Sequence, residues 1–497
     1  MKLIFRSNIK VVLGCTAFLL ASQACTDLSE NVYDVIPTDA FGSTPAQQAA
    51  LIGPLYSTVG DYFDRLISTS EVTTDAITVP TRGGDWKDGD EWRRMDQHTW
   101  DPTQDNGRFN GIWNWCYNSI TSINQQLNTI TEPSTVAELR ALRAFYHYIA
   151  MDHFGNVIIA EKTGSGSPDQ KSRAEVFAWV EKELLEVYPN LSGVAGGIYY
   201  GRFNKYVANM ILAKMYLNAQ VYTGTPQWQK AVDNLNVIIN SGSFALSADF
   251  LSNFSAQNQN SRETILAAPF DRSKRGGMNI HMRTLHYKMQ LTYNLPNAPW
   301  NGYCTLAEFY NSFSNNDNRK KMWLVGQQYD AAGKPLDDDG VPLAFTPEIP
   351  AYEMPAGPTA RLAGVRSQKY EIQKNLPSND MDNDFVIYRL GDAYLMRGEA
   401  NFRLGKSAEA LADFNVIRTR AGIPAYTAAT LNLNEILAER GRELAWEGHR
   451  RQDMVRFGQY TKAWQFKAVS PETRNLFPIP KDQIALNPKL KQNPGYN

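Results

Sequence analysis

The chain has 497 residues, which suffices for two or three average domains or for one extended helical array with inserted loops. Its 50 Lys and Arg nearly balance its 51 Asp and Glu, so the charge gives no reason to expect nucleic acid or an anionic membrane surface as a partner. Four Cys are too few for a disulfide framework.

The N-terminus has the pattern of an export signal. Lys2, Arg6 and Lys10 are followed by an uninterrupted run of apolar and small residues from Val11 to Ala21. This run is too short to span a bilayer stably. Residues 1–24 therefore predict a secretory signal peptide.

Cys25 follows this signal directly. A lipoprotein signal places small residues before a cysteine whose sulfur is lipidated, and Ala24 fits this rule, although Ser22 stands where Leu is usual. The alternative is ordinary cleavage after Ser22-Gln23-Ala24, which would release a soluble protein. We favour lipidation of Cys25, because a lone Cys at the cut is otherwise unexplained. Removal of the three basic signal residues leaves 47 Lys and Arg against 51 Asp and Glu, a net charge of about −4.

The segment after Cys25 is polar and turn-rich. Residues 25–45 contain Pro37 and Pro45 and suit a tether between an anchor and a folded body. Further along, Cys116 and Cys304 are the remaining cysteines. A single disulfide between them is allowed in an oxidising compartment, but a large domain needs none, and we expect two buried free thiols.

Helical periodicity dominates both ends of the body, 46–242 and 384–460. Ser134 and Ser172 are start signals, and Gly155 and Gly422 are stop signals. The predicted helices are Ala46–Asp64, Phe109–Ile130, Val136–Phe154, Arg173–Val187, Arg202–Tyr222, Trp228–Ile239, Phe385–Leu404, Ser407–Arg420, Leu433–Glu447 and His449–Tyr460.

Two of the predicted helix pairs resemble each other. Ala231–Ile238 and Ala410–Ile417 share their pattern, and each follows a helix rich in Ala and Tyr after a short turn that contains Gly224 or Gly405. Small residues at close contacts and a unit of about 34 residues are typical of tetratricopeptide-like repeats. The alternative is two unrelated amphipathic hairpins.

The middle of the chain, 243–383, is rich in Gly, Pro, Asn and aromatic residues. A loop region of this length inside a compact protein is usually disordered or functional, and its aromatic content argues against disorder. We therefore predict a mostly α fold with a loop-rich insertion that contains short strands, followed by a C-terminal extension over 461–497.

The sequence offers little for catalysis. None of the six His forms a zinc pair on a helix, and neither a phosphate-binding Gly loop nor a Gly-x-Ser-x-Gly elbow is present. His147 and His153 lie in an aromatic helix, where satisfied core histidines are expected. The run Asp337–Gly340 lacks the alternating ligands of a calcium loop, so we interpret it as a solvated turn. We predict no enzyme, no metal and no cofactor, although paired carboxylates of a glycoside hydrolase depend on three-dimensional spacing.

Two loops present tryptophan beside polar groups. Residues 80–94 hold Asp85, Trp86 and Trp92 among three Gly, and residues 297–303 hold Trp300 and Asn301 after Pro299. Indole faces stack on sugar rings, while carboxylates and amides hydrogen-bond to the hydroxyls. These five residues are the candidate ligand-binding residues. The alternative for each Trp is that it packs its loop onto the body, which is as good a reading for Trp86 and Trp300 and the better one for Trp92 and Trp100.

The most specific strings lie in the C-terminal half. They are NDFVIYRLGDAYLMRGEA (383–400), IRTRAG (417–422), RGRELAWEGHRRQDMVRFG (440–458) and QNPGY (492–496). Together with Thr74-Asp75 and Pro478-Ile479-Pro480, they resemble the SusD/RagB family of outer-membrane nutrient-binding lipoproteins along essentially the whole chain. In the third string Arg442, Glu443, Glu447 and Arg450 have helical spacing and are expected to pair along one face, while Leu444 and Trp446 turn inward.

The resemblance implies a single domain over 46–497, with about four tetratricopeptide-like helix pairs as scaffold and the loops over 243–383 as ligand-binding region. It also implies carbohydrate binding for nutrient uptake and polysaccharide utilisation, localisation at the outer membrane through a lipid on Cys25 with exposure at the cell surface, and a SusC-type TonB-dependent transporter as partner. The ligand of such proteins is usually a glycan fragment, and some relatives take peptides.

The first hypothesis is therefore a non-enzymatic lipoprotein that binds oligosaccharides and passes them to the transporter. The alternatives are a peptide-binding member of the same family, a secreted glycoside hydrolase, and a helical-repeat adaptor that binds only protein.

Overall fold

A computed structural model describes residues 44–164 and 166–496, with the side chains of residues 45, 46 and 48 left out. The chain divides into two compact units, Met1–Ile52 and Gly53–Asn497. The predicted signal peptide, Cys25 and nearly all of the predicted tether lie outside the described residues. Within the described part, no helix combines the length and the apolar character that a membrane crossing requires.

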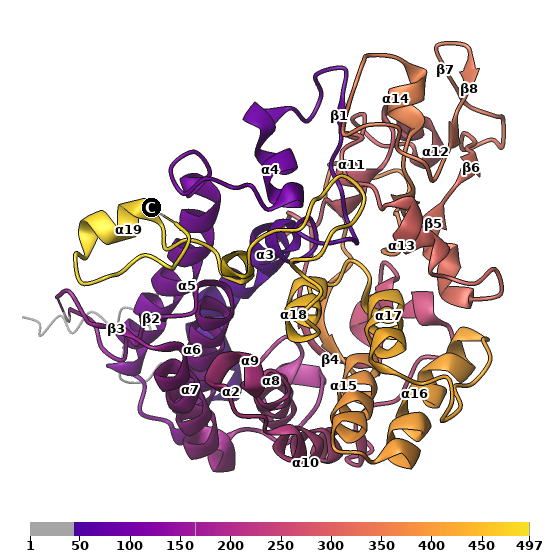
Figure 1. The fold of residues 1–497 in the computed structure, drawn as a ribbon. Coiled ribbons are helices and arrows are strands. Elements are labelled where there is room, and N and C mark those ends of the chain that lie inside the picture. The colour runs from indigo at the N-terminus through magenta and orange to yellow at the C-terminus, as the bar shows by residue number, and fades with distance from the viewer. Residues whose placement is uncertain (1–43, 165, 497) are drawn as a thin grey trace, which may run out of the picture. The chain divides into compact units, whose positions relative to one another are not determined.

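The described part is mostly α-helical, as predicted (Figure 1). Its α-helices are α2 (Pro45–Ser57), α3 (Tyr62–Ser70), α4 (Glu91–Gln97), α5 (Asn106–Leu127), α6 (Pro133–Phe154), α7 (Arg173–Val187), α8 (Lys205–Leu217), α9 (Ala219–Thr223), α10 (Trp228–Ile239), α11 (Ile280–Thr284), α12 (Gln290–Tyr293), α13 (Ala307–Asn311), α14 (Pro358–Leu362), α15 (Leu390–Arg403), α16 (Ser407–Ala421), α17 (Leu433–Leu444), α18 (Arg450–Arg456) and α19 (Lys481–Leu486).

The strands are short and form two-stranded pairs. The pairs are β1 (Thr81–Arg82) with β10 (Glu353–Met354), β2 (Val157–Ile158) with β3 (Gln170–Lys171), β4 (Thr264–Ala268) with β12 (Phe385–Arg389), β5 (Trp323–Leu324) with β11 (Arg366–Ser367), β6 (Gly326–Gln327) with β9 (Ala344–Phe345), and β7 (Asp337–Asp338) with β8 (Val341–Pro342).

Successive helices pack side by side in the manner of a helical repeat. The hairpin of α8 and α10 packs through α10 against α15, which in turn forms the hairpin with α16 (Figure 1). These are the two helix pairs that the sequence predicts to be repeats. Because residues 240–389 separate α10 from α15 along the chain, the loop-rich middle is an insertion between two neighbours of one scaffold.

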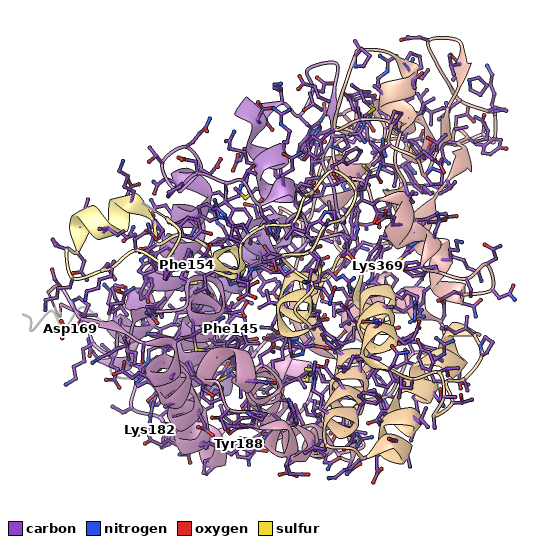
Figure 2. The ribbon with its side chains drawn as sticks, viewed as in Figure 1. Phe145, Phe154, Asp169, Lys182, Tyr188 and Lys369 are labelled. Carbon is purple, nitrogen blue, oxygen red and sulfur yellow. The ribbon has the colours of Figure 1, made fainter. Side chains whose placement is uncertain are left out.

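The buried faces of the helices are aromatic. Phe145 and Phe154 lie on α6 within the packed helices (Figure 2), and the Phe145 ring contacts the ring of Phe203 edge-on at 5.4 Å. Six of the eleven Trp are buried, Trp100 and Trp446 among them, which confirms a core role for Trp100. Most of the abundant aromatic surface therefore serves packing.

Several predicted helix ends are confirmed. α7 begins with a capping box between Ser172 and Glu175, and α6 and α16 end at Gly155 and Gly422, both with positive φ. The start of α6 differs from the prediction, because the Glu132 side chain, rather than Ser134, accepts the backbone N–H groups of the first turn.

The predicted helix Phe385–Leu404 is wrong in its first five residues. Phe385–Arg389 forms β12, pairs antiparallel with β4 and is buried throughout. A short apolar run that contains two β-branched residues and precedes a helical pattern can form either a strand or the first turn of the helix. Here its pairing with β4 makes it a strand. The helix α15 begins at Leu390.

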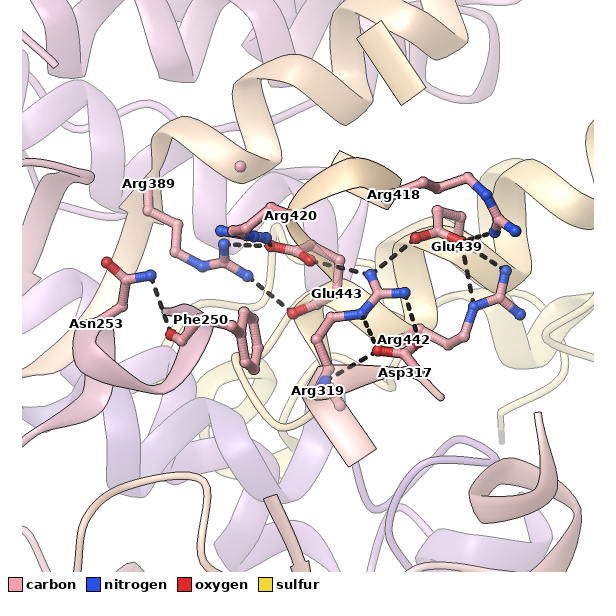
Figure 3. A network of polar contacts seen from close by, with 12 residues as sticks. Phe250, Asn253, Asp317, Arg319, Arg389, Arg418, Arg420, Glu439, Arg442 and Glu443 are labelled. Atoms are coloured by element: carbon pink, nitrogen blue, oxygen red, sulfur yellow. Dashed lines mark hydrogen bonds and ion pairs between the residues drawn. The ribbon is translucent and has the colours of Figure 1, made fainter. Parts of the chain in front are cut away.

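The pairing predicted within the charged C-terminal string is also wrong. α17 ends at Leu444 and Trp446 has a φ of 62°, so no continuous helix face joins Arg442 to Arg450. Glu443 pairs instead with Arg389, Arg319 and Arg420 of other elements (Figure 3), whereas Arg442 pairs with Glu439 on its own helix. Leu444 and Trp446 are buried, as predicted.

Candidate functional site

A cavity of about 540 Å³ lies where α3, the segment 86–92, the first turns of α5 and the residues around Trp300 meet. Three of the five candidate ligand-binding residues, Trp86, Trp92 and Trp300, line it. Its full lining is Asp64, Arg65, Trp86, Glu91, Trp92, Gln104, Asp105, Gly107, Arg108, Ile112, Arg283, Trp300 and Tyr303. Two other cavities, of about 420 and 590 Å³, contain no tryptophan.

Trp86 joins the two tryptophan loops. Its indole N–H donates to the backbone carbonyl of Trp300 at 2.6 Å, and its ring lies against the Cα of Gly302, where any side chain would overlap it. Its backbone has a φ of 60°, which is uncommon for a bulky residue. The loop thus holds this indole in one orientation at the cavity wall.

The buried side chain of Arg82 holds the loop over residues 297–303 against its own loop, residues 80–94. This buried side chain donates to the carbonyls of Asn301 and Gly302 at 2.9 Å, and to those of Ala360 and Ala363 at 3.0 and 3.1 Å. The guanidinium group suits this task because its five N–H groups point in fixed directions. Residues 82, 301 and 360 are far apart in sequence and are brought to one point by this side chain.

Trp92 packs within the cavity wall and exposes little of its ring to the cavity. Its ring lies 5.6 Å from that of Trp86 and 5.7 Å from that of Tyr303, and its indole N–H donates to Asp88 at 2.7 Å. The Arg108 guanidinium covers it at 4.6 Å, and only 7% of the residue is exposed. The packing role favoured for Trp92 from the sequence agrees with this burial.

Trp300 and its neighbour Asn301 have opposite environments. Trp300 is 37% exposed, whereas Asn301 is fully buried. The Asn301 side chain accepts a hydrogen bond from Arg366 at 2.8 Å and donates to the carbonyl of Arg361 at 3.0 Å. Asn301 therefore holds the loop and does not line the cavity.

Asp85 is exposed but also stands outside the cavity lining, where its carboxylate accepts a hydrogen bond from the hydroxyl of Tyr287. The structure therefore brings three indoles to one cavity and leaves Asp85 and Asn301 beside it.

The charged groups of the lining are mostly paired. Arg283 donates to Asp64 at 2.6 Å, Arg108 pairs with Glu91, and Asp105 accepts from Arg94 at 2.5 Å. Partial burial alone would raise the pKa of Asp64, but the Arg283 guanidinium outweighs it and the pKa lies below the ordinary value. Nothing in the sequences of α3 and α5 marks which helix face meets a cavity, so Asp64 and Arg108 could not be predicted as lining residues.

Other predicted side chains have structural roles. Cys116 and Cys304 are buried free thiols, as predicted. His147 accepts from the backbone N–H of Ala160 at 3.0 Å while its other ring nitrogen contacts the carbonyl of Arg143, as expected of a core histidine.

The run Asp337–Gly340 forms the β7–β8 hairpin, but it is only partly solvated. Asp338 is buried and accepts from Arg361 at 2.6 Å, so the predicted solvated turn is wrong at this residue. Within residues 44–164 and 166–496, no group of three or more metal-ligating side chains is present.

Two family models match the chain. One, described as "Starch-binding associating with outer membrane", covers residues 38–217, and the other, described as "SusD family", covers residues 360–496. The chain belongs to the SusD family. The loop that carries Trp300 lies between the two matched stretches.

SusD relatives cover most of the chain. The starch-binding protein SusD of Bacteroides thetaiotaomicron is 26% identical over 467 residues, which cover 83% of this chain and 82% of SusD. The SusD-like protein P38 of Formosa agariphila is 24% identical and covers 77% of this chain and 79% of its own length.

Solved structures share the fold. A laminarin-binding SusD-like protein matches with a TM-score of 0.73 at 23% identity, over 91% of this chain and 99% of its own. Surface glycan-binding protein A from Bacteroides thetaiotaomicron, in complex with laminarihexaose, matches with a TM-score of 0.72 at 20% identity, over 91% and 100%. These likenesses establish the SusD-type helical scaffold for this chain.

Proposed function

We propose that this SusD-family chain is a non-enzymatic outer-membrane lipoprotein that binds oligosaccharides and delivers them to a SusC-type TonB-dependent transporter. The observation that carries the proposal is the meeting of Trp86, Trp92 and Trp300, from loops more than 200 residues apart, on one cavity. The exposed indole of Trp300 offers a stacking face, and arginine and glutamine side chains around it offer hydrogen bonds to hydroxyl groups. The names of the relatives, a starch-binding and a laminarin-binding protein, support the same ligand class.

The expected affinity is modest. A stacking contact contributes about 1 kcal/mol, so two or three of them with a few hydrogen bonds give micromolar to millimolar dissociation constants. Weak binding suits a protein that must release its ligand to a transporter.

The carboxylates of the cavity argue against a glycoside hydrolase. Such an enzyme needs one carboxylic acid that keeps its proton near neutral pH. Asp64 has a lowered pKa beside Arg283, Glu91 pairs with Arg108, and Asp105 pairs with Arg94. The ion pair of Asp64 favours its charged form, and Glu91 and Asp105 are each bound to a guanidinium group, an arrangement that suits ligand binding better than proton donation.

Affinity electrophoresis in polysaccharide gels tests the site directly. We expect at least one polysaccharide gel to retain the wild type. The Trp86→Ala and Trp300→Ala variants should each be retained less, with an affinity about tenfold lower than that of the wild type. Trp228→Ala, at the start of α10 and outside the cavity, is the matched control. Unchanged retention of both cavity variants would refute the site, and release of sugar from the polysaccharide would favour a hydrolase. Retention by no glycan, together with binding of a peptide, would favour the peptide-binding alternative.

The membrane part of the proposal depends on Cys25, which lies outside the described residues. Metabolic labelling with a fatty-acid analogue should mark the wild type but not a Cys25→Ser variant, and equal labelling of both would contradict the anchor. Co-purification of the transporter with the lipidated protein tests the delivery step.

A further inference from the structure

We propose that the ligand of this cavity is an acidic glycan, whose carboxylate or sulfate substituent binds to Arg65 while a neighbouring ring stacks on Trp300. This inference rests on the proposed function and names the class of glycan. It is carried by the balance of charges around the cavity and by the position of one arginine.

The cavity lining has three arginines and three carboxylates. Arg283 and Arg108 are each neutralised by a carboxylate of the lining, Asp64 and Glu91. The third carboxylate, Asp105, is fully buried as a side chain and is neutralised by Arg94, which stands outside the lining. All three acids are therefore matched, and one cation of the lining is left over.

That cation is Arg65. It lies on α3, is exposed, and makes no ion pair or hydrogen bond among the residues that the structure describes. The carboxylate of its neighbour Asp64 forms its ion pair with Arg283, and the charge of Arg65 acts on that carboxylate without a direct contact. The Arg65 guanidinium passes over Gly111 of α5, where a Cβ would lie 3.3 Å from Nη1. The absence of a side chain at Gly111 thus gives the Arg65 head its place at the cavity.

Two buried arginines add to the positive potential. Arg82 and Arg366 lie beneath the Trp300 loop, donate to backbone carbonyls and to Asn301, and have no carboxylate partner among the described residues. Burial, and then the charge of Arg82, lower the pKa of Arg366 to about 9, which leaves it protonated at neutral pH. Buried charges are screened less by salt than surface charges.

Two carboxylates of the 80–94 loop, Asp85 and Asp88, lie outside the cavity lining. Asp85 accepts from Tyr287 and Asp88 accepts from the indole of Trp92. The ligand therefore meets, on one side, a guanidinium that makes no ion pair within the described part of the chain and, on the other side, indoles. A guanidinium group binds two oxygens of one oxyanion through two parallel hydrogen bonds, and uronic acids and sulfated sugars supply such an oxyanion whereas neutral sugars do not.

Isothermal titration with size-matched hexasaccharides tests the proposal. The ligands are a neutral glucan, a hexauronate and a sulfated galactan, each titrated at low and at high salt. We expect the wild type to bind at least one acidic hexasaccharide ten or more times more tightly than the neutral one at low salt, with the difference shrinking at high salt. The uronate and sulfate arms decide which anion is the ligand.

Variants at Arg65 separate charge recognition from general sugar binding. Arg65→Gln should weaken binding of the acidic ligand tenfold or more and binding of the neutral one much less, and Arg65→Lys should retain part of the preference. Arg262→Gln, at an exposed arginine that likewise makes no ion pair in the described chain, is the matched control.

Binding of the neutral glucan as tightly as the acidic ones would overturn this inference and leave the proposed function standing. Equal losses of Arg65→Gln for both ligand classes would overturn it as well. Failure of the wild type to bind any glycan would overturn both proposals.

Discussion

At the scale of single residues, the site depends on buried side chains that do not line the cavity. Trp300 keeps its indole partly exposed because the loop behind it is fixed. Arg366 donates to the side chain of Asn301, and Arg82 donates to the backbone carbonyl of Asn301. Of these two neighbouring residues, Trp300 thus lines the cavity and Asn301 holds the loop in place. Gly302 belongs to the supporting set, since the Trp86 ring occupies the space where its side chain would stand.

A Gly302→Ala variant is expected to displace Trp86 and abolish glycan binding. The added methyl group would overlap the indole, and overpacking of this kind costs about 1–3 kcal/mol of stability. Titration calorimetry measures the binding, and urea unfolding with tryptophan fluorescence measures the stability. Gly193→Ala, at a glycine with open space around it, is the control and should bind as the wild type does.

At the scale of elements, a buried ionic network joins the insertion to the scaffold. Glu443 on α17 accepts from Arg389 at the end of β12 and from Arg319 at 3.0 Å, and it also pairs with Arg420 of α16 (Figure 3). Each of these side chains is buried. The charged residues that mark the family are therefore the joints between elements that the chain order keeps apart.

Glu443→Gln should destabilise the protein by about 3–5 kcal/mol, because three guanidinium groups would lose a shared buried counterion. Glu186→Gln removes the exposed partner of Arg140 and Lys182 and should cost less than about 1 kcal/mol. Equilibrium urea unfolding of both variants measures the contrast. A loss below 1 kcal/mol for Glu443→Gln would show that the network adds no stability.

At the scale of the whole molecule, all six histidines are buried. Burial lowers the pKa of five of them to about 4 and that of the sixth, His98, well below its ordinary value. The five are His147, His153, His281, His286 and His449. All six are less than a tenth exposed, and they are spread along the chain from His98, directly after α4, to His449, directly before α18.

The protein is therefore expected to lose stability as the pH falls from about 6.5 to 4. In this window the unfolded chain binds protons at its histidines and the folded chain does not, so acid favours unfolding. Each histidine contributes at most about 3 kcal/mol at the acid end of the window. Urea unfolding between pH 7.5 and 4 measures this slope. A stability that is flat or rises toward pH 4 would contradict the burial of neutral histidines.

Local sequence patterns predict those features that depend only on residues close together in the chain. The limits of α7 and α10 follow from periodicity and capping, and the repeat of α8 and α10 by α15 and α16 follows from small residues at helical spacing. The same reasoning failed at Phe385–Arg389, because strand formation there depends on β4, more than a hundred residues earlier.

The sequence by itself determined the helical scaffold, the family, and the two loops whose tryptophans meet at the cavity, since composition, spacing and motif strings are properties of short stretches. Only the tertiary structure decided that Asn301 supports the loop while Trp300 faces the cavity, and that Arg65, among the lining cations, makes no ion pair with any described residue. The reason is physical: burial and charge pairing depend on groups that folding brings together from distant parts of the chain, and no local pattern encodes which groups those are.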